Sequence, residues 1–507
     1  MSQFMIRGRY VVIDADSPVI EDGAVIVRDG LIESIGPYAA LAEQASGLLT
    51  LGSEKHLVLP GLVNSHTHGK GVNTFELGFA DEQLEMWILE RKAQRQPDIY
   101  WDTLLAATQL LESGVTTVLH NHVTRAPHAF EAELDHALAA YQDAGLRVAF
   151  APDIRCRNNF VYEPDDVFAS RLPEALRERF LRYVAMLDPV LLDRYLAGFD
   201  GLAARIGLNG PKHRLLFGPL SLQWTGDDEM RTIARRASDL GTGLHVHIQE
   251  SPYQRDLGPR LYGHSLVRQM HELGALTSLT TLGHAVWLTD DDIDLMAKCG
   301  ASYAHNPSSN LRLKSGISPV IRALDRGVNV ALGSDSMTIN DDDDFVQEMR
   351  LAAKLHRPPG IYERDLSSRD VLRMATTNGR KVVLFEDAGA LRVGGPADIV
   401  TMRLDRMVGT APEPGADAID MLLYRAKRED IDHVLVAGET LVSNGVATKL
   451  DKRRIAEELL ADAQRFDRAQ SADVRALMRE LRPHVHAYYD DWFRERGQPH
   501  YIYNSRG

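Results

Sequence analysis

The sequence predicts an α/β fold: a (β/α)₈ barrel with a small β-sandwich domain formed from both chain ends. The first observation is a set of eight apolar runs, rich in β-branched residues, that end in polar residues. They cover residues 57–66, 115–120, 146–153, 215–221, 243–250, 279–284, 301–306 and 328–335. The second is that segments of helical period separate most of these runs, at 129–144, 228–240, 290–298 and 318–326. Alternation of this kind predicts a barrel with its catalytic groups at the carboxyl ends of the strands.

The two chain ends carry matching strand patterns. Short strand-like stretches occur at 10–14, 24–28 and 31–35, and Arg28-Asp29-Gly30 between the last two is typical of a hairpin turn. This unit is too small to close its own core. Similar stretches return at 397–402 and 433–442. We therefore expect one β-sandwich domain from residues 1–58 and 391–450, and a barrel from residues 59–390.

Three further segments elaborate this plan. Residues 69–113 begin as a Gly-rich loop that could cover the barrel mouth, and residues 154–213 include an amphipathic helical stretch at 174–196. Packing is the favoured role for both. Residues 451–507 form a charged, helix-favouring extension with six aromatic residues near its end: Tyr488, Tyr489, Trp492, Phe493, Tyr501 and Tyr503. That much apolar surface predicts docking on the barrel or on a partner subunit.

Composition limits the class of protein. Of 507 residues, 44% are hydrophobic and 25% are charged, as in soluble globular proteins. The net charge of −14 argues against nucleic acid or an anionic membrane as the main partner and favours a small molecule. The two cysteines, Cys156 and Cys299, allow no disulfide framework and suit a reducing compartment. Without a leader-like or membrane-spanning run, the cytoplasm is the expected location.

Histidines gather at the expected strand ends. His66 and His68 are spaced i, i+2, so in a strand their side chains point to the same face. Two converging imidazoles are half of a metal site, although a histidine-rich polar turn is the alternative explanation. His247 from the fifth run and Asp335 from the eighth complete a proposed ligand set for Zn²⁺, with Fe²⁺ as the alternative.

Two more polar residues fit hydrolytic chemistry at this site. A metal with an open position lowers the pKa of its water to near neutrality. Glu250, three residues after His247, could carry a proton between water and a leaving group. An acid at a helix N-terminus is the other explanation of Glu250. His284 could polarise the nucleophile or an oxyanion. His245 competes with His247 as a ligand.

These motifs together resemble the amidohydrolase superfamily. The resemblance rests on His66-Thr67-His68, His247-Ile248-Gln249-Glu250, Gly283-His284, and the segments 305–311 and 333–336. The most similar branch holds heteroaromatic deaminases, such as cytosine, guanine and S-adenosylhomocysteine deaminases, and triazine chlorohydrolases. This resemblance implies one metal per subunit, proton shuttling by Glu250, a double role for Asp335 as ligand and proton acceptor, assistance by His284, and a homodimer or higher homo-oligomer.

The end of strand four refines the number of metals that the resemblance implies, and position along the chain suggests candidate substrate-binding residues. Two-metal members of the superfamily use a carboxylated lysine at the end of strand four, but residues 217–224 contain no lysine, which favours a single metal. By position, seven residues are candidates for substrate binding, although packing or loop hydrogen bonding explains most of them equally well. They are His122, Arg155, Gln223, Trp224, His305, Asn310 and Asn340.

The leading functional hypothesis is metal-dependent hydrolysis at an sp² carbon of an N-heterocycle. The substrate would be a purine, pterin, pyrimidine or triazine, and the leaving group ammonia, an amine or a halide. A metal-dependent amidase that opens a cyclic or acyclic amide is the alternative. A non-catalytic barrel scaffold is a third hypothesis, which the complete ligand set disfavours.

Overall fold

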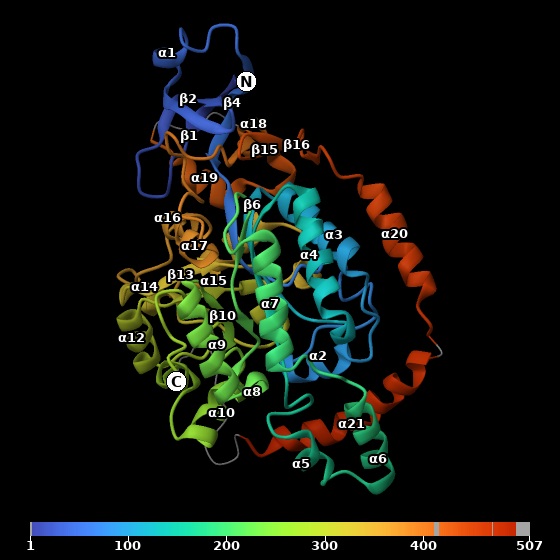
Figure 1. Ribbon diagram of the computed structural model, residues 1–507. Coiled ribbons are helices and arrows are strands. Elements are labelled where there is room, and N and C mark those ends of the chain that lie inside the picture. The colour runs from blue at the N-terminus through green and yellow to red at the C-terminus, as the bar shows by residue number, and fades with distance from the viewer. Residues whose placement is uncertain (1–2, 410–414, 469, 493–507) are drawn as a thin grey trace.

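The computed structural model describes residues 3–409, 415–468 and 470–492, and it confirms the predicted fold class (Figure 1). Parallel strands form the barrel, and β8 and β9 share its fourth position. The barrel strands are β5 (Leu62–Thr67), β6 (Val115–His122), β7 (Arg147–Ile154), β8 (His213–Leu215), β9 (Gly218–Pro219), β10 (Leu244–Ile248), β11 (Thr280–His284), β12 (Ser302–His305) and β13 (Asn329–Leu332).

Two short bridges close this barrel. Strands β5 to β8 form one sheet and β10 to β13 another, and the pairs Phe217–Leu244 and Thr67–Asp335 join them. At the second seam, the backbone N–H of Asp335 donates to the carbonyl of His66 at 2.9 Å. The N–H of His68 in turn donates to the carbonyl of Asp335 at 2.8 Å. Closure of the barrel therefore fixes the ends of its first and last strands against each other.

Both chain ends contribute to one eight-stranded mixed sheet. The sequence predicted a β-sandwich from both ends; the joint contribution of the two ends is confirmed, and their strands form one sheet. Its order is β17-β16-β15-β14-β4-β1-β2-β3, and β4 pairs with β14 to join the two ends. In Figure 1 this sheet caps one end of the barrel. Its strands are β1 (Gln3–Val11), β2 (Ile20–Arg28), β3 (Leu31–Pro37), β4 (Leu49–Pro60), β14 (Ile399–Arg403), β15 (Ile431–Val436), β16 (Glu439–Ser443) and β17 (Val446–Ala447).

The structure corrects two expected elements. The run at 57–66 is not one strand, because it divides at Gly61 between β4 of the mixed sheet and β5 of the barrel. A Cβ at Gly61 would lie 2.1 Å from Oγ1 of Thr116, so only glycine fits this crossing. The stretch at 174–196 is two helices, because Pro189 and the left-handed Asp188, at φ 42°, interrupt it.

Helices cover the mixed sheet and surround the barrel strands, and many of them pack on these strands through a continuous apolar core. Those before the fifth barrel strand are α1 (Tyr38–Leu41), α2 (Leu84–Arg91), α3 (Ile99–Glu112), α4 (Phe130–Ala144), α5 (Asp165–Ala169), α6 (Glu174–Ala185), α7 (Leu192–Ile206), α8 (Leu222–Thr225) and α9 (Asp227–Leu240). Those after it are α10 (Pro252–Tyr262), α11 (Leu266–Glu272), α12 (Asp290–Cys299), α13 (Pro307–Arg312), α14 (Val320–Asp325), α15 (Phe345–Leu355), α16 (Ser368–Met374), α17 (Thr377–Val383), α18 (Leu404–Met407) and α19 (Ala418–Arg425). Among the helices of the described residues, none combines the length and apolar character needed to cross a membrane.

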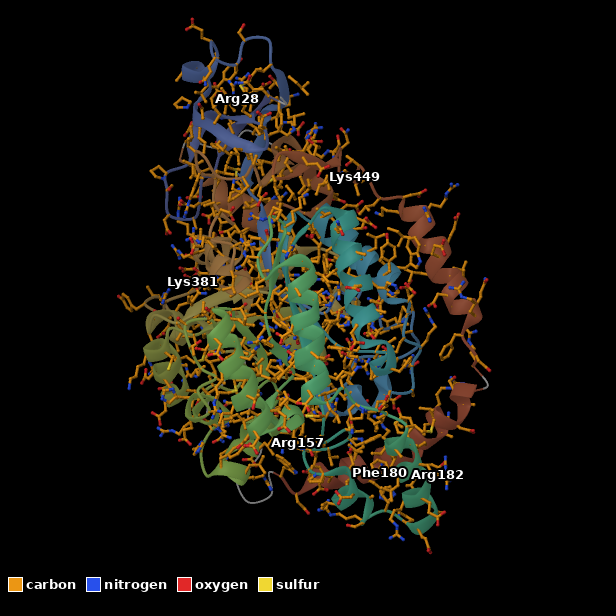
Figure 2. The ribbon with its side chains drawn as sticks, in the orientation of Figure 1. Arg28, Arg157, Phe180, Arg182, Lys381 and Lys449 are labelled. Atoms are coloured by element: carbon orange, nitrogen blue, oxygen red, sulfur yellow. The ribbon has the colours of Figure 1, made fainter. Side chains whose placement is uncertain are left out.

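The C-terminal extension docks on the barrel helices. Helix α20 (Lys452–Arg465) packs on α3, and α21 (Gln470–Asp490) packs on α2 and α6 (Figure 1). A second apolar core lies beneath α21, where Leu477 and Leu481 join a buried cluster that includes Phe180 (Figure 2). The extension thus supports α2, which borders the cavity described below. Phe493, Tyr501 and Tyr503 lie outside the described residues.

Candidate metal centre and active site

The four proposed ligands meet at the carboxyl end of the barrel. Nε2 of His66 and Nε2 of His68 lie 3.3 Å and 3.1 Å from Oδ1 of Asp335. Nε2 of His247 lies 3.3 Å from Nε2 of His68. Strands β5, β10 and β13 are far apart in the sequence, and closure of the barrel brings their ends together. Three imidazole nitrogens and one carboxylate oxygen therefore face a common point.

Each of these imidazoles is held by its other nitrogen. Nδ1 of His68 donates to the carbonyl of Asn121 at 2.7 Å, and Nδ1 of His247 donates to that of Leu220 at 3.1 Å. Nδ1 of His66 shares a hydrogen bond of 2.7 Å with Nε2 of His245. Outer partners of this kind fix the ring orientation of metal ligands. His245, which competed as a ligand in the sequence, is thus the partner of one.

The protonation states of this group suit a divalent cation. Burial lowers the pKa of His66 to about 3 and also lowers the pKa of His68 and His247, so the three rings are neutral at pH 7. Burial would raise the pKa of Asp335, but its contacts with His66 and His68 hold that pKa well below its usual range. Nε2 of His66 is fully buried, and no described residue makes a well-aligned hydrogen bond to it. Neutral imidazoles, an ionised carboxylate and an orphaned ring nitrogen fit a bound metal.

Glu250 and His284 lie beside this group. A ring nitrogen of His284 lies within 4.8 Å of donor atoms of His66 and Asp335. Its Nδ1 donates to Oδ1 of Asn310 at 2.9 Å and lies 3.7 Å from Oε1 of Glu250. Burial raises the pKa of Glu250 to about 7, with Asp335 adding to the rise and His284 opposing it. A carboxyl group with this pKa can both hold and release a proton near neutral pH.

Left-handed backbone marks three of the strand ends. Gln249, His284 and Asp335 have φ values of 47°, 66° and 58°, a conformation that costs free energy in residues other than glycine. Each lies at or beside a polar side chain of the site. The backbone turns sharply after these strands, which directs the functional groups into the space above the barrel.

That space is a cavity of about 290 Å³. Its lining includes His68, His247, Glu250, His284 and Asp335 together with the aromatic residues Phe79, Trp87 and Trp224. A cavity of this kind, mostly apolar with a few convergent polar groups, is typical of small-molecule sites.

Two of the predicted substrate-binding residues, Arg155 and Trp224, line this cavity. The other predicted residues are buried beside it with partners of their own, and among the described residues they do not line it. His122 bonds to Glu133 at 2.9 Å, Gln223 to Ser221 at 2.6 Å, His305 to His356 at 3.3 Å, Asn310 to His284 at 2.9 Å, and Asn340 to Glu348 at 2.7 Å. Their substrate contacts stay predictions.

Sequence reasoning missed the cationic part of the lining. Lys70, Arg91, Lys92, Arg95 and Arg125 also line the cavity. Lys70 follows His68 by only two residues, so its closeness to the histidine motif could have marked it as a residue of the cavity lining. The others lie in or after α2 or after β6, where no periodic pattern shows that a side chain faces the barrel mouth.

Comparison with known proteins identifies the family. The sequence profile of the amidohydrolase family matches residues 57–197 and 217–441, which is more than half of the chain. The chain belongs to the amidohydrolase family. This amidohydrolase is therefore a hydrolase that acts on carbon–nitrogen bonds, and its histidine and aspartate group offers donor atoms that suit a divalent metal.

Two relatives and one solved structure are reported for this amidohydrolase. It is 29% identical over 467 residues to a 5′-deoxyadenosine deaminase of Methanosarcina barkeri, which covers 90% of this chain and 97% of that protein. It is 31% identical over 451 residues to a 5-methylthioadenosine/S-adenosylhomocysteine deaminase of Nitratidesulfovibrio vulgaris, at 86% and 91% coverage. The zinc complex of atrazine chlorohydrolase from Arthrobacter aurescens matches with a TM-score of 0.72 and 25% identity, covering 90% and 99%.

Proposed function

We propose that this amidohydrolase replaces an amino group, an alkylamine or a halide on an N-heterocycle by oxygen from water. The observation that carries the proposal is the position of Glu250, with a pKa of about 7, next to His284 in the cavity that the metal ligands line. Relatives named as adenosine-type deaminases favour a purine and ammonia. A structure named as a chlorohydrolase supports the same addition of water with a halide as leaving group.

The chain's own residues divide the proton transfers. When bound, a divalent cation supplies Lewis-acid activation, which lowers the pKa of water toward neutrality. Asp335 accepts a proton from the attacking water, and Ser309 Oγ, which donates to Oδ2 of Asp335 at 2.5 Å, fixes its carboxylate. His284, oriented by Asn310, stabilises charge on the attacking oxygen. Glu250 protonates the leaving group, so the ring carbon gains an oxygen and ammonia, amine or halide departs.

Substitution of Glu250 tests this role. Glu250→Gln keeps the size of the side chain and removes its proton exchange. We expect at least about 10²-fold slower turnover with unchanged metal content. The measurement is ammonia or halide release from purines, pterins, pyrimidines and triazines, together with metal analysis of the same samples. An active, metal-replete variant would contradict the role.

Product analysis separates the proposal from the amidase alternative. A deaminase or chlorohydrolase yields ammonia or halide and keeps the ring, whereas an amidase forms a new carboxylate, from an opened ring where the amide is cyclic. Mass spectrometry of the product distinguishes the two. The ring product is the expected result.

We further propose one Zn²⁺ per chain, with Fe²⁺ as the alternative, since this donor set accepts either metal. The three rings and one carboxylate provide a single coordination group, which supports one ion. Metal analysis of protein purified from metal-supplemented cultures tests both points. A homodimer and a cytoplasmic location stay predictions; equilibrium sedimentation and fractionation of the source cells would test them.

A further inference from the structure

Cationic side chains outnumber carboxylates in the cavity lining, although the net charge of the protein is −14. Six cationic side chains line the cavity: Lys70, Arg91, Lys92, Arg95, Arg125 and Arg155. Two of them are neutralised by carboxylates. Arg125 pairs with Asp102 at 2.9 Å, and Arg95 pairs with Asp462 of α20.

The other four, which we call the cation wall, are Lys70, Arg91, Lys92 and Arg155. Within the described residues, none of the four has a carboxylate within 4.0 Å. Arg91 and Arg155 lie over the rings of Trp87 and Trp224, at 5.5 Å and 4.7 Å from the ring centroids. Lys92 lies 4.8 Å from the ring centroid of Phe160. Nη2 of Arg155 donates to the carbonyl of Asn158 at 2.9 Å, whereas its buried Nε has no partner in the described part of the chain.

The members of the cation wall also repel one another. Burial lowers the pKa of Arg91 to about 10, and the charges of Arg125 and Arg155 lower it further, while Asp335 and Asp153 oppose the fall. Burial also lowers the pKa of Arg155 to about 10, against the opposing charges of Asp165 and Asp153. Burial lowers the pKa of Lys92 well below its usual value; the charges of Arg155 and Arg91 add to this effect, and Asp165 opposes it. Like charges in a partly dry cavity cost free energy unless a counter-charge joins them. A divalent cation at the neighbouring ligand group would add to the positive charge.

We propose that the cation wall binds an anionic oxygen group, a carboxylate or a phosphate, on the heterocyclic substrate. Arg91, Lys92 and Arg155 would contact it directly. The two guanidinium groups offer paired N–H donors that match either oxyanion. The members of the cation wall line the same cavity as His68, His247 and Asp335, which places the anion and the reacting ring in one cavity. This inference rests on the proposed function, because it names the substrate class of that same site.

Three adenosine compounds with the same leaving group test the proposal. Adenosine is neutral, adenosine 5′-monophosphate carries a phosphate, and adenosine-5′-carboxylic acid carries a carboxylate. For the wild-type metal-loaded enzyme we expect at least one anionic compound to exceed adenosine by about 10-fold to 100-fold in kcat/KM, as for charged hydrogen bonds. The better of the two anions identifies the group.

The variants Arg91→Gln, Lys92→Gln and Arg155→Gln should each lower kcat/KM for the preferred anionic compound more than for adenosine, so that the preference falls by about 10-fold. Arg182→Gln and Lys381→Gln are matched controls. Arg182 has a side chain 68% exposed to solvent, Lys381 is exposed, and both lie on the outside of the molecule (Figure 2). The controls should change nothing.

A second measurement does not need turnover. Calorimetric titration of the metal-loaded wild type with inorganic phosphate and with acetate should show saturable binding of at least one anion, weakened about 10-fold in the three wall variants. Equal kcat/KM for neutral and anionic nucleosides, together with no saturable anion binding, would overturn the cation wall. Failure of the proposed function looks different, because then no heterocycle of any charge releases ammonia, amine or halide from the metal-loaded enzyme.

Discussion

The histidine side of the cavity and its cation wall differ in how their polar atoms are partnered. On the histidine side, every ligand imidazole is oriented by a hydrogen bond to its Nδ1, and Asp335 is held by Ser309. On the cation wall, Arg91, Lys92 and Arg155 face aromatic rings, and none of the four side chains has a carboxylate within 4.0 Å among the described residues. The first side is preorganised for a cation that belongs to the enzyme. On the cation wall, the positive charge is neutralised when the enzyme binds its anionic substrate.

Loss of the carboxylate ligand should have the largest effect. Asp335→Asn keeps the shape of the side chain but removes its charge, so both metal binding and proton acceptance are impaired. We expect turnover to fall by about 10⁴-fold, the upper end for a group that transfers protons. Steady-state rates and metal content of the same samples provide the measurement.

Asp341→Asn is the matched control, because Asp341 has a side chain 55% exposed and lies outside the cavity lining. It should leave both quantities unchanged. An Asp335→Asn variant that keeps its metal and stays within tenfold of the wild-type rate would contradict the conclusion that the histidine side is preorganised for a metal.

A buried acid behind the histidine side should make stability depend on pH. Burial raises the pKa of Glu348 from 4.5 to about 7, although its carboxylate accepts hydrogen bonds from Asn340 and from the N–H of Ser308. Between these values the folded protein binds more protons at Glu348 than the unfolded chain does. Its contribution is therefore complete below about pH 4.5 and is lost as pH rises through about 7, a change of about 3 kcal/mol.

Urea unfolding at several pH values, with wild type and Glu348→Gln compared, measures that contribution. The wild type should lose stability relative to the variant as pH rises from about 4.5 to about 7. A constant difference between the two proteins across this range would mean that the Glu348 carboxyl titrates normally in the folded state.

Loss of His245, the partner of His66, should weaken metal binding less than loss of a ligand does and more than loss of a surface contact does. His68 and His247 are oriented by backbone carbonyls, so among the three ligand imidazoles only His66 has a side-chain partner, His245, that can be substituted. His245→Ala should weaken metal binding by about 10-fold to 100-fold, measured by competition with a chelator. His245→Gln, whose side-chain oxygen can accept from Nδ1 of His66, should recover part of this loss. Equal affinity in all three proteins would show that the ring needs no partner.

The difference between the histidine side and the cation wall also explains which residues of the site could be predicted from the sequence. His66, His68, His247 and Asp335 lie at or just beyond strand ends, where period-2 patterns and barrel topology place side chains together. Lys70 and Arg91 belong to a loop and a helix end whose orientation depends on packing against the rest of the molecule. The same applies to His305 and Asn310, which local pattern places at a strand end but tertiary contacts hold beside the cavity.

The support behind the cation wall should show the smallest effect. Arg482 of α21 pairs with Glu82, just before α2, and with Glu90, in the last turn of α2, and the Glu90 contact is 2.8 Å long. These side chains are 25% to 32% exposed, so the pairs are screened by water. Arg482→Gln should lower the free energy of unfolding by less than about 1 kcal/mol. Because the apolar core beneath α21 carries most of the docking, preference for an anionic nucleoside should persist in this variant. Loss of that preference would mean that the ion pairs, and not the core, hold Arg91 and Lys92 in place.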